Sequence, residues 1–143
     1  MSPDTTPPLP VPDELSTGFW EHAAAHVLAI ARCAHCGHYS HPPGVVCSAC
    51  LNPDPAFAFI PVSGNGTVRS FTVIRDSFLP GFAAEVPFVL VDVELDEQSD
   101  LRLIGRLVDG PDAPLGLGAR VNVVFDDRAL GVAIPAFALA DAR

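Results

Sequence analysis

Residues 33–50 read CAHCGHYSHPPGVVCSAC, and they contain every cysteine of the chain. Two residues between paired cysteines allow one tight turn to direct both sulfur atoms at a single ion, and two such pairs supply the four thiolates of a tetrahedral site. Gly37 follows the first pair, at a position where such a turn often needs a positive φ. The segment therefore predicts a zinc ribbon with four ligands, Cys33, Cys36, Cys47 and Cys50.

Other uses of these cysteines are open from spacing alone. Iron in a rubredoxin-like site has the same ligand spacing, and two disulfides are a further alternative. We expect metal rather than disulfides because no signal peptide precedes the cysteines. A thioredoxin-like redox pair is disfavoured because no βαβ pattern surrounds either pair. His35, His38 and His41 crowd the same segment, but the four thiolates already suffice, so we expect these imidazoles at the surface.

A site closed by four thiolates has no open position for a substrate. The metal is therefore expected to be structural, and to hold together a module that is too short to bury a core of its own. The ribbon is predicted to be a scaffold and not a catalytic centre.

The composition indicates a loop-rich, β-rich protein. The chain has 143 residues, 49% of them hydrophobic, with 15 prolines and 11 glycines. This apolar content allows a buried core, but no run of 18 apolar residues is present to cross a membrane. We expect a cytoplasmic protein of one ordinary domain, or of a small domain plus a metal-stapled module.

The charge balance argues against a nucleic-acid partner. The formal net charge is −9, and all 8 basic residues are arginine. From Phe57 onward, seven arginines face twelve carboxylates, which leaves a net charge of −5 on this part of the chain. Proteins that hold nucleic acid through its phosphates need the opposite sign.

Three regions follow from the order of the sequence: a flexible proline-rich tail (1–17), a helix with the ribbon (18–56) and a β-domain (57–143). A short helix is expected over Gly18–His26. It is too short to be stable alone, so its aromatic pair Phe19 and Trp20 must pack either on this chain or on another one.

Strands are expected on both sides of the metal segment and throughout the last region. Val89, Val91, Val93 and Leu95 alternate with Asp92 and Glu94, which is typical of a half-buried strand. Asp126-Asp127 is expected to turn the chain into a last strand. Phe57–Val62 is expected to enter the barrel and to continue as Thr67–Ile74 after a bend at residues 63–66, so the two segments form one long first strand. The resulting five strands, without a long intervening helix, fit a small antiparallel barrel of OB type, and a sandwich-like sheet fits the periodicity nearly as well. The expected strands are Val27–Arg32, Tyr39–His41, Phe57–Val62, Thr67–Ile74, Phe88–Leu95, Leu101–Val108, 121–125 and Gly131–Ala136.

From Gly18 to Phe137 the chain resembles the DUF35 family, which combines a rubredoxin-like zinc ribbon with an OB fold. Each motif alone is weak, and the combination is specific. The motifs that carry the resemblance are Phe19-Trp20-Glu21, Arg32-Cys33-x-x-Cys36-Gly37, Pro42-Pro43, Cys47-x-x-Cys50, Gly64-x-Gly66-Thr67-Val68-x-Ser70-Phe71-Thr72, Pro87-Phe88, Leu117-Gly118-x-x-Val121 and Ile134-Pro135-x-Phe137.

The resemblance implies an accessory subunit of a thiolase-fold enzyme that acts on acyl-CoA thioesters, such as a thiolase, an acyltransferase or a steroid side-chain aldolase. It further implies a hetero-oligomer such as α₂β₂, a MaoC-like hydratase as an additional partner, and catalytic residues on the partner chain. Consistent with this, the residues show no catalytic constellation of their own, such as a Ser/His/Asp arrangement or a phosphate-binding loop. The alternative is a nucleic-acid-binding protein, because ribbons and OB folds both occur there.

Two sets of residues are candidates for contacts outside the chain. The first is apolar and is expected to bind the partner: Phe19, Trp20, Phe78, Leu79, Pro80 and Phe82. The chain has arginines but no lysine to meet the phosphates of CoA, and the second set contains the arginines expected to contact a CoA thioester at a site shared with the partner: Arg69, Arg75, Arg102 and Arg106. Cross-strand ion pairs with Asp92 or Glu94 are the default for these arginines.

Overall fold

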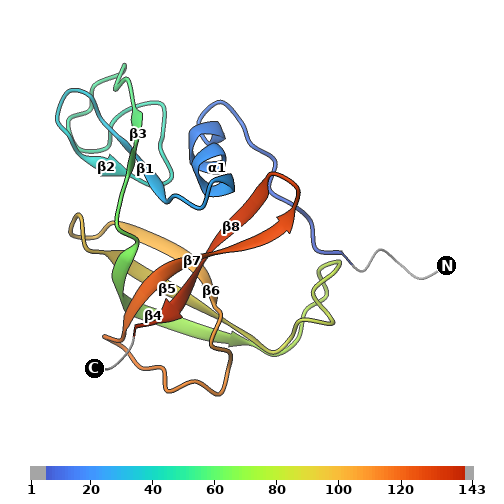
Figure 1. Ribbon diagram of the computed structural model, residues 1–143. Helices are drawn as coiled ribbons and strands as arrows, with labels where there is room; N and C mark the ends of the chain where they lie inside the picture. Colours follow the sequence, from blue (N-terminus) through green and yellow to red (C-terminus); the bar gives the residue numbers. More distant parts are fainter. Residues whose placement is uncertain (1–5, 141–143) are drawn as a thin grey trace.

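The computed structural model describes residues 6–140, so the first five residues of the expected tail and the last three of the β-domain lie outside it. One helix and three short strands precede a barrel of five strands (Figure 1). The elements are α1 (Thr17–Ala24), β1 (Ala29–Arg32), β2 (Tyr39–Ser40), β3 (Ala58–Pro61), β4 (Asn65–Ile74), β5 (Phe88–Leu95), β6 (Arg102–Leu107), β7 (Arg120–Ala129) and β8 (Val132–Leu139).

Helix α1 forms where the sequence predicts a helix, but it ends earlier. Asp13 organises the turn before it, because its Oδ1 accepts hydrogen bonds from the backbone N–H groups of Leu15 and Ser16. The helix stops at Ala24, and His26 adopts a φ of 61°, outside the helical range. Phe19 and Ala23, four residues apart, form its buried stripe.

The ribbon is a three-stranded sheet in the order β2-β1-β3. The third strand, β3, differs from its prediction. Residues 57–62 were expected to enter the barrel, but β3 pairs with β1 of the ribbon, for example Ile30 with Ile60. The break before β4 has a local cause. Gly64 has a φ of +79°, and a Cβ there would lie 2.0 Å from Val123, so the chain can turn at this point only without a side chain.

The five remaining strands close into a barrel in the order β4-β5-β6-β8-β7, with β6 and β8 parallel and the other pairs antiparallel. This is the strand order of an OB fold. The alternation in β5 is confirmed, since all four of its predicted inward residues are buried. The fully buried side chains of the barrel include Val68, Leu107, Val121 and Phe137.

The last hairpin differs from its prediction. Asp126 and Asp127 do not turn the chain but lie within β7, and the turn comes at Leu130-Gly131, where Gly131 has a φ of +74°. The register of β7 against β8 shifts between Asp127 and Ala129. Arg128 lies at this irregularity and donates a hydrogen bond to Glu85, a residue distant in sequence. The part of β7 that extends beyond the predicted strand thus contains a long-range contact.

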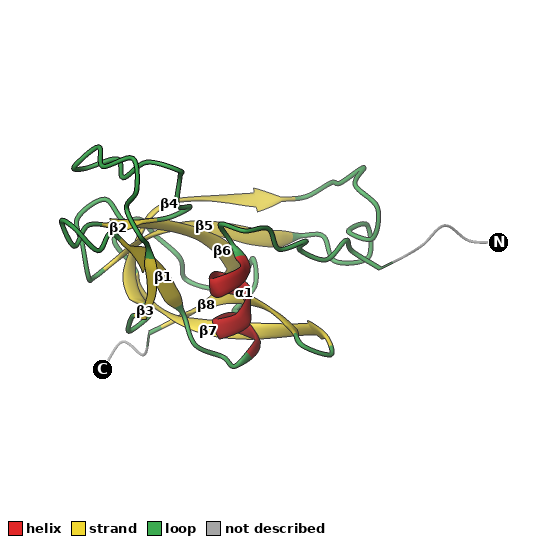
Figure 2. Ribbon diagram, turned by 90° about the horizontal axis from the view of Figure 1, so that it is seen from above, coloured by secondary structure: helices red, strands yellow, loops and turns green. Residues whose placement is uncertain are grey.

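The ribbon and the barrel share one core. Phe19 of α1 and Ile30 of β1 belong to the same buried cluster as Val91 and Phe137 of the barrel. Helix α1 packs against β8 of the barrel and β1 of the ribbon, and it lies beside β8 in the view from above (Figure 2). None of the helices in the described part of the chain has the length and apolar character that crossing a bilayer requires.

Candidate functional site

The four cysteines meet at one point, as their spacing predicts. Their sulfur atoms all lie within 4.8 Å of one another. The Sγ atoms of Cys33 and Cys50 are 3.8 Å apart, and those of Cys36 and Cys47 are 3.6 Å apart. Four thiolates at about 2.3 Å from a central zinc would be separated by roughly 3.8 Å, so the arrangement fits a tetrahedral ion.

Local backbone geometry produces this convergence. Gly37 has a φ of +76°, and its N–H donates to the carbonyl of Cys33 at 2.9 Å, which closes the first knuckle. In the second knuckle the N–H of Leu51 donates to the carbonyl of Cys47 at 2.9 Å. The backbone N–H of Cys50 lowers the pKa of the Cys47 thiol to about 6, whereas burial and the neighbouring Cys47 sulfur raise the pKa of the Cys50 thiol to about 11.

Two of the three neighbouring histidines contact other parts of the chain, and His41 is half-buried rather than at the surface as expected. A ring nitrogen of His35 lies 2.8 Å from the carbonyl oxygen of Asp54, and the ring of His41 stacks on Phe19 with centroids 4.9 Å apart. Burial lowers the pKa of His41, which keeps its ring neutral.

An apolar cleft lies between the ribbon and the barrel. It has a volume of about 300 Å³ and is bounded by Trp20 of α1, the Pro42-Pro43 turn and the outward side chains Ile104 and Ile134 of β6 and β8. Phe19 also lines it but is only 6% exposed, whereas Ile104 is 64% exposed. Phe19 thus belongs to the core of this chain, which leaves Trp20 as the accessible aromatic residue of the expected helical pair.

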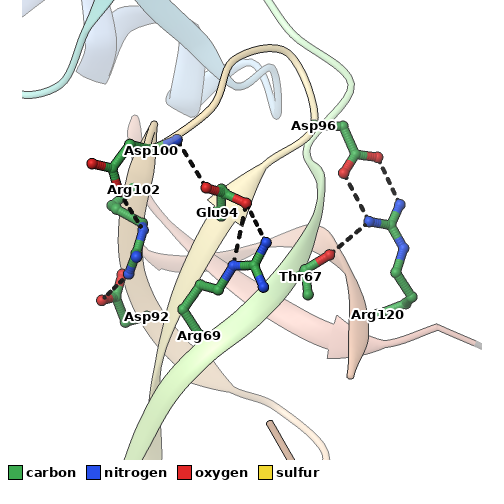
Figure 3. Close-up of polar contacts among 8 residues, drawn as sticks. All are labelled: Thr67, Arg69, Asp92, Glu94, Asp96, Asp100, Arg102 and Arg120. Atoms are coloured by element: carbon green, nitrogen blue, oxygen red, sulfur yellow. Dashed lines mark hydrogen bonds and ion pairs between the residues drawn. The ribbon is translucent and has the colours of Figure 1, made fainter. Parts of the chain in front are cut away.

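Three of the four expected arginines are paired within the chain (Figure 3 shows two of them). Arg69 binds Glu94, and Arg102 lies 2.8 Å from Asp92 and 3.3 Å from Asp100. The hydrogen bond from Arg69 lowers the pKa of Glu94. The pair of Arg102 with Asp92 is the default that was expected for the β6 arginines, whereas Arg106 departs from it and pairs with Glu85.

The third arginine belongs to a cluster that the sequence did not indicate. Glu85 accepts from Arg106 of β6 at 2.6 Å and from Arg128 of β7 at 3.0 Å. The bond from Arg128 is the main reason that the pKa of Glu85 falls to about 2. Arg106 also lies over the ring of Phe88, 4.1 Å from its centroid. Arg75, at the end of β4, is exposed and has no ion pair with another residue among 6–140.

The connection between β4 and β5, residues 75–87, extends beyond the barrel wall on the side of the N-terminal segment (Figure 1). Phe78 is 97% exposed and Leu79 is 54% exposed, and Pro80 is also exposed. Phe82 differs because it is half-buried, with its ring 6.0 Å from that of Phe88. We call residues 75–87 the arm. Its tip presents apolar side chains that residues 6–140 leave exposed.

Two further contacts join the ribbon to the barrel, and neither was predicted. The side chain of Gln98, in the turn after β5, bonds both the N–H and the carbonyl of Tyr39, each at 2.9 Å. A ring nitrogen of His26 lies 2.8 Å from Asp127, and the ring stacks on Phe125. These contacts could not be predicted from the sequence, because a single glutamine in a turn and a single histidine after a helix form no recognisable motif.

Two family models match the chain: the rubredoxin-like zinc ribbon domain of ChsH2 over residues 20–56, and the C-terminal OB-fold domain of ChsH2 over residues 59–126. Among solved structures, the Ltp2-ChsH2(DUF35) aldolase matches with a TM-score of 0.79 and 30% identity, covering 92% of this chain and 99% of that chain. A DUF35 protein from Sulfolobus solfataricus shares the fold, with a TM-score of 0.60 and 13% identity over 89% of this chain and 86% of that chain.

Curated relatives are longer proteins. The chain is 35% identical over 109 residues to the 3-oxo-4,17-pregnadiene-20-carboxyl-CoA hydratase alpha subunit of Mycobacterium tuberculosis, covering 76% of this chain and 33% of the relative. It is 38% identical over 91 residues to a probable enoyl-CoA hydratase alpha subunit of Thermomonospora curvata, covering 63% of this chain and 27% of the relative. The chain therefore spans a third or less of the length of these relatives.

Proposed function

We propose that this chain, which belongs to the ChsH2 (DUF35) family of zinc-ribbon and OB-fold proteins, is a non-catalytic accessory subunit of a cytoplasmic enzyme complex acting on acyl-CoA thioesters. The observation that carries the proposal is the aldolase structure, in which a chain of matching fold and 99% coverage is named together with Ltp2. Steroid side-chain or other lipid degradation is the proposed context, since the relatives are named for CoA thioesters.

The proposed partner is a thiolase-fold subunit that contributes the catalytic residues, in a hetero-oligomer such as α₂β₂, with a MaoC-like hydratase as a possible further component. Within residues 6–140, the carboxylates Asp92, Glu94 and Glu85 are each paired with an arginine. The four thiolates leave no coordination position open for a substrate. A role in assembly accounts for both features.

In this proposal the metal is zinc and its role is structural. Cys33 directly follows β1 and is buried, as is Cys47, so the ion would fix β1 in the centre of the ribbon sheet. The ribbon is connected to the barrel through the shared core, and the metal would therefore help to hold the surface formed by α1, β6 and β8 in one shape.

The partner is proposed to cover the arm tip and the rim of the cleft. Phe78, Leu79 and Pro80 on the arm, and Trp20 with Ile104 at the cleft, are apolar groups in contact with solvent. Exposed apolar groups gathered in this way mark protein interfaces. Phe82 supports the arm from behind by packing near Phe88.

A CoA thioester would be bound only at a site shared with the partner. Arg75 is the best placed of the four candidate arginines, because Arg69, Arg102 and Arg106 already neutralise carboxylates. Arg75 stands at the base of the arm, next to the proposed interface. Replacing Arg75 with Ala is expected to weaken acyl-CoA binding by the complex modestly, by about threefold to tenfold, because one exposed cation contributes roughly 1 kcal/mol.

A substitution at the arm tip tests the proposed interface. Phe78→Asp places a charge in the buried centre of the contact, so affinity for the co-expressed Ltp2-type subunit of the same organism should fall at least about tenfold. The melting temperature of the isolated chain should not change, because Phe78 is 97% exposed. The matched control is Leu130→Asp, since Leu130 is equally exposed in the turn between β7 and β8. Equal binding by wild type and both variants would contradict the proposed interface.

A further inference from the structure

Strand β4 has different neighbours along its two halves. Its first residues lie between two strands: Asn65, Gly66 and Thr67 pair with β7, and the pairing with β5 runs from Gly66 to Ile74. On the β7 side, the last backbone bonds join Val68 to Ala119 and Gly118, at 2.9 and 2.8 Å. Over the part of the chain that the structure describes, residues 69–74 are thus hydrogen-bonded on one side only.

The unpaired side of residues 69–74 is the outer edge of the molecule, where β4 leads into the arm (Figure 2). We call it the β4 edge. Alternate backbone groups of a strand point to opposite sides, so an unpaired edge presents a row of free N–H and C=O groups.

The β4 edge lacks the features that usually prevent strand pairing. Its sequence, Arg69-Ser-Phe-Thr-Val-Ile74, contains neither proline nor lysine. Its one charged residue, Arg69, is neutralised by Glu94 of the neighbouring strand. The bulge between Val68 and Ser70 falls at the start of the edge, and the register beyond it is regular through Ile74. β-branched and aromatic residues with regular geometry favour the addition of a strand.

The two faces of this edge define the segment that would fit it. Phe71 pairs with Val91 and Val73 with Val89, and both partners are buried, so this face continues the interior of the barrel. Phe71 is nevertheless 42% exposed. Ser70 and Thr72 lie on the opposite, solvent-facing side. A matching segment is therefore extended and alternating, apolar toward Phe71 and Val73 and polar toward Ser70 and Thr72.

We propose that an extended segment of the enzyme subunit adds to the β4 edge as a further antiparallel strand, an inference that rests on the proposed function for the existence of that subunit. Two observations favour the enzyme subunit over a second copy of this chain. The edge runs directly into the arm, whose exposed tip is the proposed docking surface. Each copy of this chain carries a formal net charge of −9, so two copies repel each other.

Hydrogen exchange measured on the full chain, alone and in its co-expressed complex with the Ltp2-type subunit, tests this pairing. Outward amides of residues 69–74 should exchange rapidly in the free chain and at least about tenfold more slowly in the complex. Residues 123–127 of β7, which are paired with β8 in the free chain, serve as the internal control. A complex in which the arm is protected but residues 69–74 exchange as before overturns the inference and leaves the proposed function standing. Failure to form any complex overturns both.

Proline substitutions separate main-chain pairing from side-chain contact. The N–H groups of Phe71 and Thr72 point to opposite sides of the strand. Of the two variants Phe71→Pro and Thr72→Pro, one therefore removes a hydrogen bond to β5, and the other removes an N–H donor from the unpaired edge. We expect one of the two variants to keep the melting temperature near that of wild type while losing at least about tenfold in affinity. Thr72→Val, which changes no backbone group, should bind as wild type. If both proline variants fold and bind normally, or if Thr72→Val loses as much affinity as the prolines, the inference is wrong.

Discussion

The four cysteines are the residues on which the stability of the ribbon is expected to depend most directly. Cys36→Ser removes one of four ligands, and we expect the purified protein to hold well below one equivalent of metal and to melt at a lower temperature, since binding free energy contributes to folding in such sites. Elemental analysis and calorimetric melting measure both effects. His38→Ala is the control, because His38 lies beside the site without being among the ligating residues of the described chain. Full metal content in Cys36→Ser would contradict the assignment of this ligand.

Glu85 is the residue whose ionisation should matter most for stability in acid. Its pKa of about 2 lies below the ordinary glutamate value of 4.5, so the folded state favours the carboxylate. The stabilisation is fully present above pH 4.5 and is lost as pH falls through about 2. Glu85→Gln should lower the free energy of unfolding at pH 7 by about 1–2 kcal/mol and flatten its decline across this window, as followed by urea denaturation at several pH values.

A matched comparison is Asp112→Asn, in the exposed connection before β7. This variant should follow the wild-type pH dependence. If Glu85→Gln also does so, Glu85 does not stabilise the fold through its two arginines.

The convergence of the four cysteines was predictable from sequence and the Glu85 cluster was not, for a physical reason. Four cysteines at fixed short spacing specify a site through local turns alone. Glu85, Arg106 and Arg128 come from three separate segments, and they meet only because the barrel brings β6 and β7 to the base of the arm.

At the scale of elements, the turn between β5 and β6 holds the ribbon against the barrel. Gln98→Ala removes two hydrogen bonds to the backbone of Tyr39. We expect a loss of about 1–2 kcal/mol and faster hydrogen exchange in β2, with little change in β7. Gln98→Glu keeps the acceptor and loses the donor, so it should fall between Gln98→Ala and wild type at neutral pH. Unchanged exchange in β2 of Gln98→Ala would show that the shared core alone fixes the ribbon.

The strands themselves illustrate which elements a sequence specifies. β5 alternates with period two and was predicted within its observed bounds, because its inward valines must be buried whatever its partners are. β3 was predicted as a strand but not as part of the ribbon sheet, since its pairing with β1 depends on the turn at Gly64. The end of β7 was misplaced because two consecutive aspartates resemble a turn, whereas here Asp126 pairs with Arg128 and Asp127 with His26.

At the scale of the whole molecule, the charge is distributed in a way that suits a subunit rather than a ligand-binding protein. Most arginines of the barrel form ion pairs along the outer face of the barrel, and Arg120 forms another such pair with Asp96. The net charge is −9. An isolated chain of this kind offers little to the phosphates of a CoA thioester, whereas its apolar arm and cleft rim are suited to a protein partner.

Calorimetric titration of acetyl-CoA into the isolated chain, and into its co-expressed complex with the Ltp2-type subunit, is the most direct test of this account. An accessory subunit predicts no measurable binding by the isolated chain, with a Kd above about 1 mM, and clear binding by the complex. Micromolar binding by the isolated chain would contradict the account and would move the acyl-CoA site into this subunit.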